Sequence, residues 1–227
     1  MMKQFSIFCR VMLLGIVCAL SLPAFSIGND NGEESGVPYE AVDLGLSVKW
    51  ATCNVGATAP EQSGGYYAWG ETEEKKNYEW STYKWCNGSS DTMIKYCTDS
   101  SRGTVDNKTV LDPEDDVARV KWGGNWRMPT KAELDELRDK CTWSWTTRSG
   151  VKGYKVTGPN GNSIFLPVTG YRYGTGIHNR TRSGIFWPSS LSSDDSSYAY
   201  YLYFDDEYYD GLSYHRYYGH TVRPVCK

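Results

Sequence analysis

The second half of the chain alternates apolar and polar positions with the period of β-strands. TWSWTT (142–147), GYKVTG (153–158) and SIFLPV (163–168) are separated by RSGVK and PNGN, and the latter contains an Asn-Gly pair of the kind that hairpin turns use. A polar, glycine-rich stretch at 171–184 is expected to be a loop. IFWPSS, SYAYYLYF and SYHRYYGHTVRPVC then predict further strands.

The strand predicted at 198–204 has two distinct faces. Successive side chains of a strand point to opposite sides, so alternate residues belong together. One face carries Tyr198, Tyr200, Leu202 and Phe204, and the other carries Ala199, Tyr201 and Tyr203.

The first half is less periodic and richer in turns. YEAVDLGLSVKWATCNVGA predicts a strand pair around Gly45, with Val48 and Trp50 on one face. GGYYAWGE predicts a short aromatic strand. Residues 71–109 are polar, and we expect a long loop insertion with a few short strands.

LDPEDDVARVKW predicts the first of two helices. Asp112 can cap it, Pro113 fits the first turn, and Glu114, Asp115 and Asp116 favour the positive end of the helix dipole. The three acids are consecutive, whereas a calcium loop requires alternating ligands, so we interpret them as helix-starting residues.

RMPTKAELDELRD predicts the second helix. Thr130 is the expected N-cap, Glu133 completes a capping box, and Leu134 and Leu137 form the apolar stripe. No neighbouring residue supplies Arg127 with a nucleophile or base, so we expect a buried structural arginine that pairs with a carboxylate.

Composition agrees with a strand-rich domain. Aromatic residues make up 15% of the 227 residues, with 18 Tyr and 9 Trp. The formal net charge of −3 argues against a nucleic-acid partner, which would favour a basic face. The length suits one sizeable domain.

Residues 1–26 have the pattern of a signal peptide. Lys3 and Arg10 precede or flank a short apolar run, and Ala24 and Ser26 occupy the small-residue positions before a cleavage site. The mature chain is therefore expected to be exported, to the periplasm, the cell surface or the medium, without a transmembrane segment.

The alternative for this leader is a lipoprotein signal that uses Cys18. Val17 is larger than the small residue usual before a lipidated cysteine, which favours the signal-peptide interpretation. The polar, glycine-rich segment 27–37 is expected to be a flexible tether, and residues 38–227 form the domain.

Five cysteines remain after export, and an oxidising compartment makes them disulfide candidates: Cys53, Cys86, Cys97, Cys141 and Cys226. Cys86 and Cys97 can close a local loop, and Cys141 can meet either Cys53 or Cys226. The number is odd, so one thiol stays free or pairs outside the chain. The chain has no CxxC and no Cys/His cluster, so no zinc site is expected and no metal ligands are assigned. The acids of SSDDSS and FDDEYYD leave calcium open, although solvated loops are the default expectation.

Several segments resemble known domain families. RMPTKAELDELRD resembles the Arg-Leu-Pro-Thr-x-x-Glu segment of formylglycine-generating-enzyme-type domains. The closing G…TVRPV is similar to their Gly-Phe-Arg-hydrophobic terminal strand, with Thr221 and Val222 in place of Gly-Phe. DLGLSVKWATCNVGA, YYAWGE, WGGNWRMPT, GNSIFLP and VRPV resemble, in order, segments of the Fibrobacter succinogenes major paralogous domain of exported bacterial proteins.

The resemblance implies a fold rather than a reaction. It implies an α+β domain of C-type-lectin-like fold over residues 38–227, with two short helices packed on twisted antiparallel sheets and with long loops. It also implies an exported setting, and in such domains the ligand face is built from loops of the C-terminal half.

The first functional hypothesis is an extracellular binding module. Eleven of the 18 tyrosines lie between Tyr171 and Tyr218 among Ser, Asp, Gly, Asn and His, a mixture typical of antibody paratopes. The candidate ligand contacts are Tyr171, Tyr173, His178, Arg180, Trp187, Tyr208, Tyr209, Tyr214 and His215. Since tyrosine is also a good strand residue, about half of these tyrosines are expected to serve packing.

The expected partner is a glycan or a protein, because aromatic rings lie in sequence beside Asp205, Asp206 and Asp210. His215 and His220 are expected to face solvent on a strand and at its end. No cofactor is expected, and the Glu-Pro-Asn and Trp-Asn-Asp triplets of calcium-dependent sugar-binding lectins are absent.

Two other classes of function were weighed. A structural or adhesive surface component is the alternative, which the polar tether favours weakly. An enzyme related to formylglycine-generating enzymes is disfavoured, because that chemistry needs paired reactive cysteines in the C-terminal part and only Cys226 follows Cys141. A C-terminal segment diversified by a reverse transcriptase is also compatible with the Tyr, Asn, Asp, Ser and His content.

Overall fold

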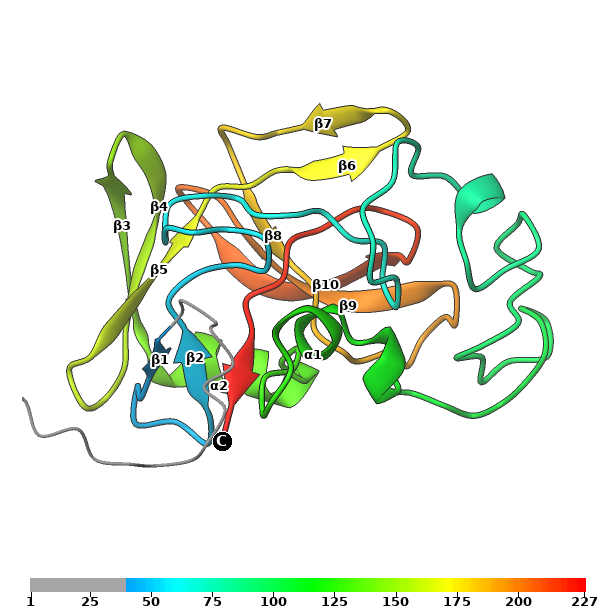
Figure 1. Ribbon diagram of the computed structural model, residues 1–227, viewed down its shortest axis with the longest axis horizontal. Coiled ribbons are helices and arrows are strands. Elements are labelled where there is room, and N and C mark those ends of the chain that lie inside the picture. The colour runs from blue at the N-terminus through cyan, green and yellow to red at the C-terminus, as the bar shows by residue number, and fades with distance from the viewer. Residues whose placement is uncertain (1–39) are drawn as a thin grey trace, which may run out of the picture. The chain divides into compact units, whose positions relative to one another are not determined.

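Short antiparallel strands and two α-helices build the described part of the chain, residues 40–227, in a computed structural model (Figure 1). This is an α+β fold. The strands are β1 (Ala41–Val42), β2 (Lys49–Ala51), β3 (Thr142–Arg148), β4 (Val151–Thr157), β5 (Ser163–Pro167), β6 (Tyr171–Tyr173), β7 (Gly176–His178), β8 (Gly184–Phe186), β9 (Tyr198–Phe204), β10 (Tyr209–His215) and β11 (Val225–Cys226). The helical elements are η1 (Trp80–Thr82), η2 (Pro113–Asp115), α1 (Val117–Trp122) and α2 (Lys131–Lys140). The predicted leader and tether at 1–37 lie outside the described residues.

The strands form three three-stranded sheets and one hairpin. The sheet orders are β1-β2-β11, β3-β4-β5 and β8-β9-β10, and β6 pairs with β7. The first sheet joins the two ends of the domain, since Trp50 of β2 lies opposite Val225 of β11. Figure 1 shows the β6-β7 hairpin above the β8-β9-β10 sheet, with α2 on the other side of that sheet. Among residues 40–227, no helix has the length and apolar character to cross a membrane.

Helix α2 begins where the sequence predicts. The Thr130 hydroxyl accepts a hydrogen bond from the Glu133 amide (3.3 Å), and the Glu133 carboxylate accepts one from the Thr130 amide (2.8 Å), which completes the capping box. Leu134 and Leu137 are buried in the core. Arg127 donates to both carboxylate oxygens of Glu133, at 2.7 and 2.5 Å. The predicted pairing of Arg127 with a carboxylate is confirmed, but its side chain is only partly buried, with 23% of its surface exposed.

Because of this ion pair, the free energy of unfolding should decrease at low pH. Burial by itself would raise the pKa of the Glu133 carboxyl, but the hydrogen bonds from Arg127 and from Thr130 outweigh burial and lower it below 4.5. The stabilisation is present above pH 4.5 and is lost as the pH falls through the lowered pKa. In urea unfolding at a series of pH values, Glu133→Gln should lose part of the acid dependence below pH 4.5. Exposed Glu207→Gln should keep it, and equal curves for the two variants would contradict the assignment.

The first helix starts later than predicted. Residues 113–115 form the 3₁₀ turn η2, and α1 begins only at Val117. The cap is Asp116, whose carboxylate accepts from the amides of Ala118 (2.9 Å) and Arg119 (3.1 Å), whereas the Asp112 side chain makes no cap bond. Asp116 also accepts from the Met128 amide at 2.8 Å, so this buried carboxylate ties the start of α1 to the segment before α2. Those extra donors explain why the helix begins there.

The alternation along β9 places its two faces in two parts of the core. Leu202 and Phe204 belong to the cluster between the β3-β4-β5 and β8-β9-β10 sheets and α2. Ala199, on the opposite face, belongs to a second cluster around Trp69. The predicted division of faces is confirmed, and each face contributes buried residues to a core cluster.

Two sequence-based assignments are wrong. GGYYAWGE contributes only an isolated bridge, Tyr67 to His220, and no strand. The segment 171–184, expected to be a loop, contains the β6-β7 hairpin, because Tyr171 pairs with His178 and Tyr173 with Gly176. The glycine-rich polar sequence gave no strand signal, and the hairpin is held in place by backbone hydrogen bonds to Tyr78 and Gly219.

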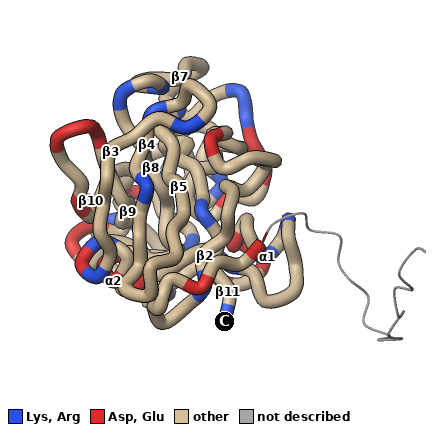
Figure 2. Tube along the Cα trace, turned by 90° about the vertical axis from the view of Figure 1, so that its left-hand side faces the viewer, with Lys and Arg blue, Asp and Glu red and all other residues tan. Residues whose placement is uncertain are grey.

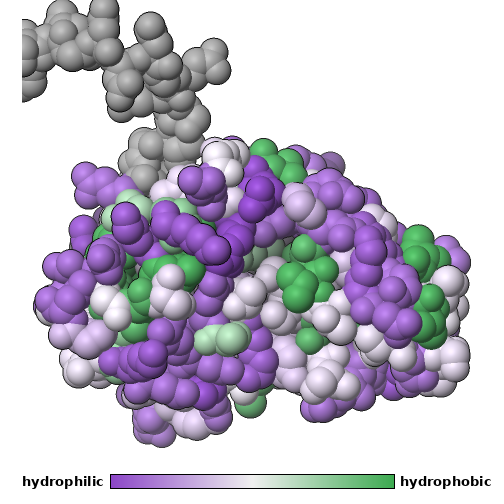
Figure 3. Space-filling model, turned by 90° about the horizontal axis from the view of Figure 1, so that it is seen from below, coloured by the Kyte–Doolittle hydropathy of each residue, from purple (hydrophilic) through white to green (hydrophobic). Residues whose placement is uncertain are grey.

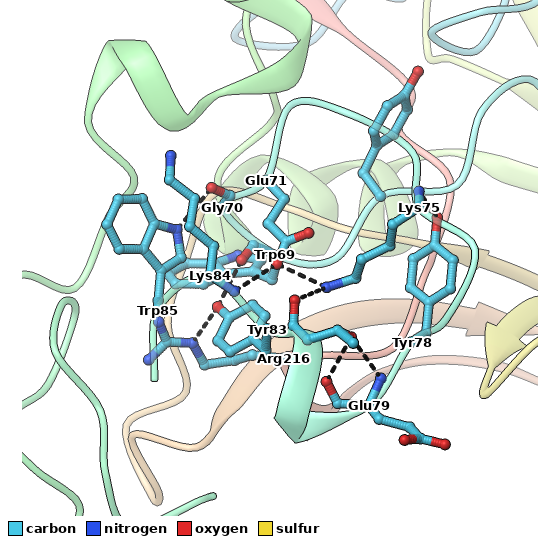
Figure 4. A network of polar contacts seen from close by, with 12 residues as sticks. Trp69, Gly70, Glu71, Lys75, Tyr78, Glu79, Tyr83, Lys84, Trp85 and Arg216 are labelled. Carbon is cyan, nitrogen blue, oxygen red and sulfur yellow. Dashed lines mark hydrogen bonds and ion pairs between the residues drawn. The ribbon is translucent and has the colours of Figure 1, made fainter. Parts of the chain in front are cut away.

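Residues 71–109 are held by buried polar contacts instead of the expected strands (Figure 4). Tyr83 donates to the Trp69 carbonyl (2.7 Å) and accepts from Nε of the fully buried Arg216 (2.9 Å). Glu71 Oε1 accepts from Lys75 Nζ and from the Lys84 amide, each at 2.8 Å. The insertion is therefore fixed, through Tyr83 and Arg216, to the segment after β10.

The surface carries mixed charge. Figure 2 shows Lys and Arg interspersed with Asp and Glu along the trace. On α2 the two signs form pairs one turn apart, Lys131 with Asp135 (2.5 Å) and Lys140 with Glu136 (2.8 Å). The face in Figure 3 is mostly hydrophilic with small, separate apolar spots, so that face offers no continuous apolar patch for a large interface.

Candidate functional site

A hollow of about 180 Å³ is lined by residues of the β6-β7 hairpin region and of the β8-β9-β10 sheet. Its walls come from six separate stretches of the chain. The lining residues are Tyr171, Asn179, Ile185, Tyr201, Tyr203, Tyr214, Tyr218 and His220. We refer to it as the tyrosine hollow.

The hairpin is fixed by backbone hydrogen bonds from β6 and from the residue that follows it. Arg172 and Gly219 exchange N–H···O bonds of 2.8 and 3.0 Å, and Tyr78 and Gly174 do the same at 2.8 and 3.0 Å. Gly170, just before β6, has a φ of +64°, which few side chains tolerate. Both the insertion and the segment after β10 therefore hold the hairpin in place.

The rings of the tyrosine hollow meet at steep angles. Tyr214 and Tyr218 lie 5.0 Å apart between centroids at 79°, and Tyr171 and Tyr218 lie 5.6 Å apart at 43°. Tyr201 and His220 lie 5.4 Å apart at 66°. The rings thus enclose a volume from several directions instead of forming one flat platform.

His220 lines this hollow and is 2% exposed, which corrects the expectation that it faces solvent. Its backbone pairs with Tyr67, and its imidazole stacks on Trp187 with a centroid distance of 3.9 Å. Burial lowers the pKa of His220 well below its ordinary value, so the ring is neutral at neutral pH. Within residues 40–227, its buried Nδ1 has no hydrogen-bond partner.

The phenols of Tyr201, Tyr203 and Tyr218 are also neutral. Burial raises the pKa of Tyr201 and of Tyr203 to about 12 and raises that of Tyr218 as well. Tyr203 donates to Asp205 at 2.9 Å, which places a carboxylate beside the Tyr203 hydroxyl. The lining residues are Tyr, Asn, Ile and His only, so the chemistry available is stacking and hydrogen bonding.

A second, more open hollow of about 330 Å³ lies beside the first; we refer to it as the outer hollow. Its lining residues are Glu79, Trp80, Ser81, Tyr173 and Tyr217. Tyr173 stacks on Tyr218 of the tyrosine hollow at 5.1 Å and 16°. The two hollows therefore share an aromatic wall, and we call them together the aromatic face.

Five of the predicted contact residues belong to the aromatic face or touch it. Tyr171 and Tyr214 line the tyrosine hollow, and Tyr173 lines the outer one. His178 stacks on Tyr171 at 5.5 Å, and His215 packs edge-on against Trp80 at 5.4 Å. These residues, distant in sequence, are brought together by the hairpin.

The other four predicted contacts lie elsewhere. Trp187 has no exposed surface, so it cannot touch a ligand directly. It donates to the Tyr67 carbonyl at 2.9 Å and stacks on His220. Tyr209 stacks on Trp143 of β3 at 4.7 Å. Tyr208 is exposed at the end of the turn that connects β9 and β10, and its hydroxyl donates to Asp210. Arg180 lines a different hollow, of about 680 Å³.

Sequence reasoning missed several lining residues, among them Tyr201, Tyr203 and Tyr218. The alternation of β9 had already placed Tyr201 and Tyr203 on one face, and that signal could have identified them. Trp80 of the outer hollow carried no signal, since it lies in the insertion. The sequence predicts a solvent-facing His220, whereas the structure buries it in the wall of the hollow.

The acidic residues before α1 are arranged around a cation of the protein itself. Ligand oxygens of Asp112, Glu114 and Asp115 lie within 4.8 Å of one another. Lys95 Nζ lies 2.7 Å from Asp112 and 2.6 Å from Asp115, so its ammonium compensates these carboxylates. The cluster is explained as an ion-pair network.

The five cysteines are free thiols in the part of the chain that the structure describes. The thiol of Cys86 contacts the Trp80 carbonyl (3.3 Å), and that of Cys97 contacts the Asp99 carbonyl (3.1 Å). The pairings suggested by the sequence stay predictions.

No protein-family model, curated protein or solved structure matches the chain.

Proposed function

We propose that the chain is an exported binding module of C-type-lectin-like fold, which recognises an extracellular glycan or protein on its aromatic face. The observation that carries the proposal is the tyrosine hollow, where rings from β6, β9, β10 and the following segment converge around a buried, neutral His220. A concave aromatic site with a few polar groups is the usual form of a ligand site.

The exposure of the tyrosines supports a binding role. Tyr173 and Tyr214 are 46% and 42% exposed, although large apolar rings favour burial. Tyrosine provides large contact area at low cost in side-chain entropy, and its hydroxyl can hydrogen-bond a glycan or a peptide. The Glu79 carboxylate at the outer hollow adds an acceptor beside the rings.

The fold and the setting enter the proposal from the sequence. Two short helices, antiparallel sheets and long loops are features that a C-type-lectin-like fold combines. Export follows from the signal-peptide pattern of residues 1–26, and the domain would follow the tether at 27–37. The proposed role is non-enzymatic.

The test is binding of the purified chain to a broad panel of glycans, mucins and surface proteins, with calcium and with chelator. Tyr214→Ala should weaken binding about tenfold or more, because a central aromatic contact contributes over 1 kcal/mol. Tyr208→Ala is the matched control, since Tyr208 is 47% exposed but lines neither hollow of the aromatic face. Loss with Tyr208→Ala alone would move the site to the turn that connects β9 and β10 and contradict the proposal.

A complete absence of binding would favour the structural or adhesive role instead. In that case the chain should be recovered in a surface assembly by cross-linking on cells. Loss of binding with chelator would add a metal requirement, which the sequence does not predict.

A further inference from the structure

The tyrosine hollow is small for a whole ligand. Its volume of about 180 Å³ lies below the roughly 300–1,000 Å³ of sites for drug-sized molecules. It can take one compact group, while the rest of a larger ligand would extend across Tyr218 and Tyr173 toward the outer hollow.

The arrangement of rings favours a compact, rounded group. A pyranose ring stacks best on a flat aromatic platform, but the rings here meet at 79°, 66° and 43°. Walls at such angles present aromatic surface to several sides of one centre. Boxes of this kind bind quaternary ammonium groups, because each ring attracts a cation through its quadrupole.

The charges of the site also favour a cation. The lining residues include no Lys or Arg, and His220 is kept neutral by burial. Asp205 accepts from the Tyr203 hydroxyl and adds a negative field. No carboxylate lines the hollow itself, which disfavours a bare ammonium, since that group is strongly hydrated and needs acceptors in place of its water.

His220 provides a second, independent observation. It is 98% buried, lines the hollow and stacks on Trp187, so it closes the base of the hollow with a neutral aromatic ring.

We propose that the tyrosine hollow binds a methylated ammonium group, with Tyr171, Tyr201, Tyr203, Tyr214 and Tyr218 as the aromatic box and His220 at its base. The inference rests on the proposed binding function and names the chemical class that the hollow takes. The group can be carried by a choline-type headgroup or by a methylated lysine side chain.

The experiment is a calorimetric titration of the purified chain with tetramethylammonium and choline, and with 3,3-dimethylbutanol, the neutral isostere of choline. The two cations should bind saturably, and the neutral isostere should bind about tenfold more weakly, because only the cation–π part of the interaction is removed. Equal binding of the isostere, or no saturable binding of either cation, would overturn the inference.

Two variants locate the binding. Tyr214→Phe keeps the ring and should bind tetramethylammonium like the parent chain, whereas Tyr214→Leu should bind it about tenfold more weakly. Tyr214 is 42% exposed, so both variants are expected to fold, which circular dichroism checks. Unchanged binding by a folded Tyr214→Leu variant would contradict the site.

Further titrations identify the molecule that carries the methylated ammonium group and distinguish failure of this inference from failure of the proposed binding function. Trimethyl-lysine peptides and phosphocholine-bearing vesicles are titrated in parallel, and preference for either one supports the chemistry and identifies its carrier. If a glycan or protein binds with Tyr214 dependence but methylated ammonium ligands do not, this inference fails while the binding function stands. If neither class binds, both fail.

Discussion

Arg223→Met is expected to lower the free energy of unfolding by about 3–5 kcal/mol, because it leaves four buried acceptor oxygens without their donor. Arg223 is 1% exposed in the segment before β11, and burial lowers the pKa of its guanidinium to about 9. Among residues 40–227 no carboxylate pairs with it, and its charge is compensated by neutral oxygens.

The size of the effect follows from the acceptors that Arg223 serves. Its guanidinium donates to Asn54 Oδ1 (2.7 Å) and to the carbonyls of Ala51 (3.0 Å), Thr52 (2.9 Å) and Phe165 (3.0 Å). These oxygens belong to β2, the segment after it and β5, so one side chain joins two sheets. Methionine fills similar space but donates no hydrogen bond, and each buried acceptor left unpaired costs about 1–3 kcal/mol.

The measurement is urea unfolding at neutral pH, with Arg182→Met as the control. Arg182 is exposed, so its replacement should change the unfolding free energy by less than about 0.5 kcal/mol. A loss below 1 kcal/mol for Arg223→Met would show that the network around this guanidinium is not needed for the fold.

Gly170→Ala is expected to cost about 2–4 kcal/mol and to release the β6-β7 hairpin from the sheet. A β-carbon at Gly170 would overlap the carbonyl oxygen of His178 and lie 2.7 Å from the Arg180 amide nitrogen, both of them backbone atoms that cannot rotate away. The φ of +64° adds strain for any L side chain. Since Tyr171 follows directly, the variant should also lose ligand binding at the tyrosine hollow.

Gly161→Ala separates the two causes. Gly161 has a φ of +89°, but a β-carbon there meets nothing within 4 Å, so only the conformational cost of about 1–2 kcal/mol should appear. Thermal unfolding and hydrogen exchange of residues 171–178 measure both effects. Equal losses for the two variants, with the hairpin equally protected, would mean that close packing at Gly170 does not hold the hairpin.

Some of the site could be read from the sequence. The crowding of tyrosines after residue 171 located the right half of the chain, and Tyr171, Tyr173 and Tyr214 are at the aromatic face. Trp187 and His220 were misplaced because composition does not distinguish a ring that covers a core from one that faces solvent. Here both are buried, one stacked on the other.

The sequence by itself determined the features that depend on bonds between near neighbours. The capping box at Thr130, the Arg127–Glu133 pair and the two faces of β9 follow from spacings of two to six residues, and local hydrogen bonding and side-chain direction fix them. The tertiary structure alone decided the tyrosine hollow. Tyr171 and Tyr201 lie on separate strand pairs, and they face one volume only because the hairpin is bonded to Tyr78 and Gly219 from distant parts of the chain. A cavity is the space left by long-range packing, and no short stretch of sequence encodes that space.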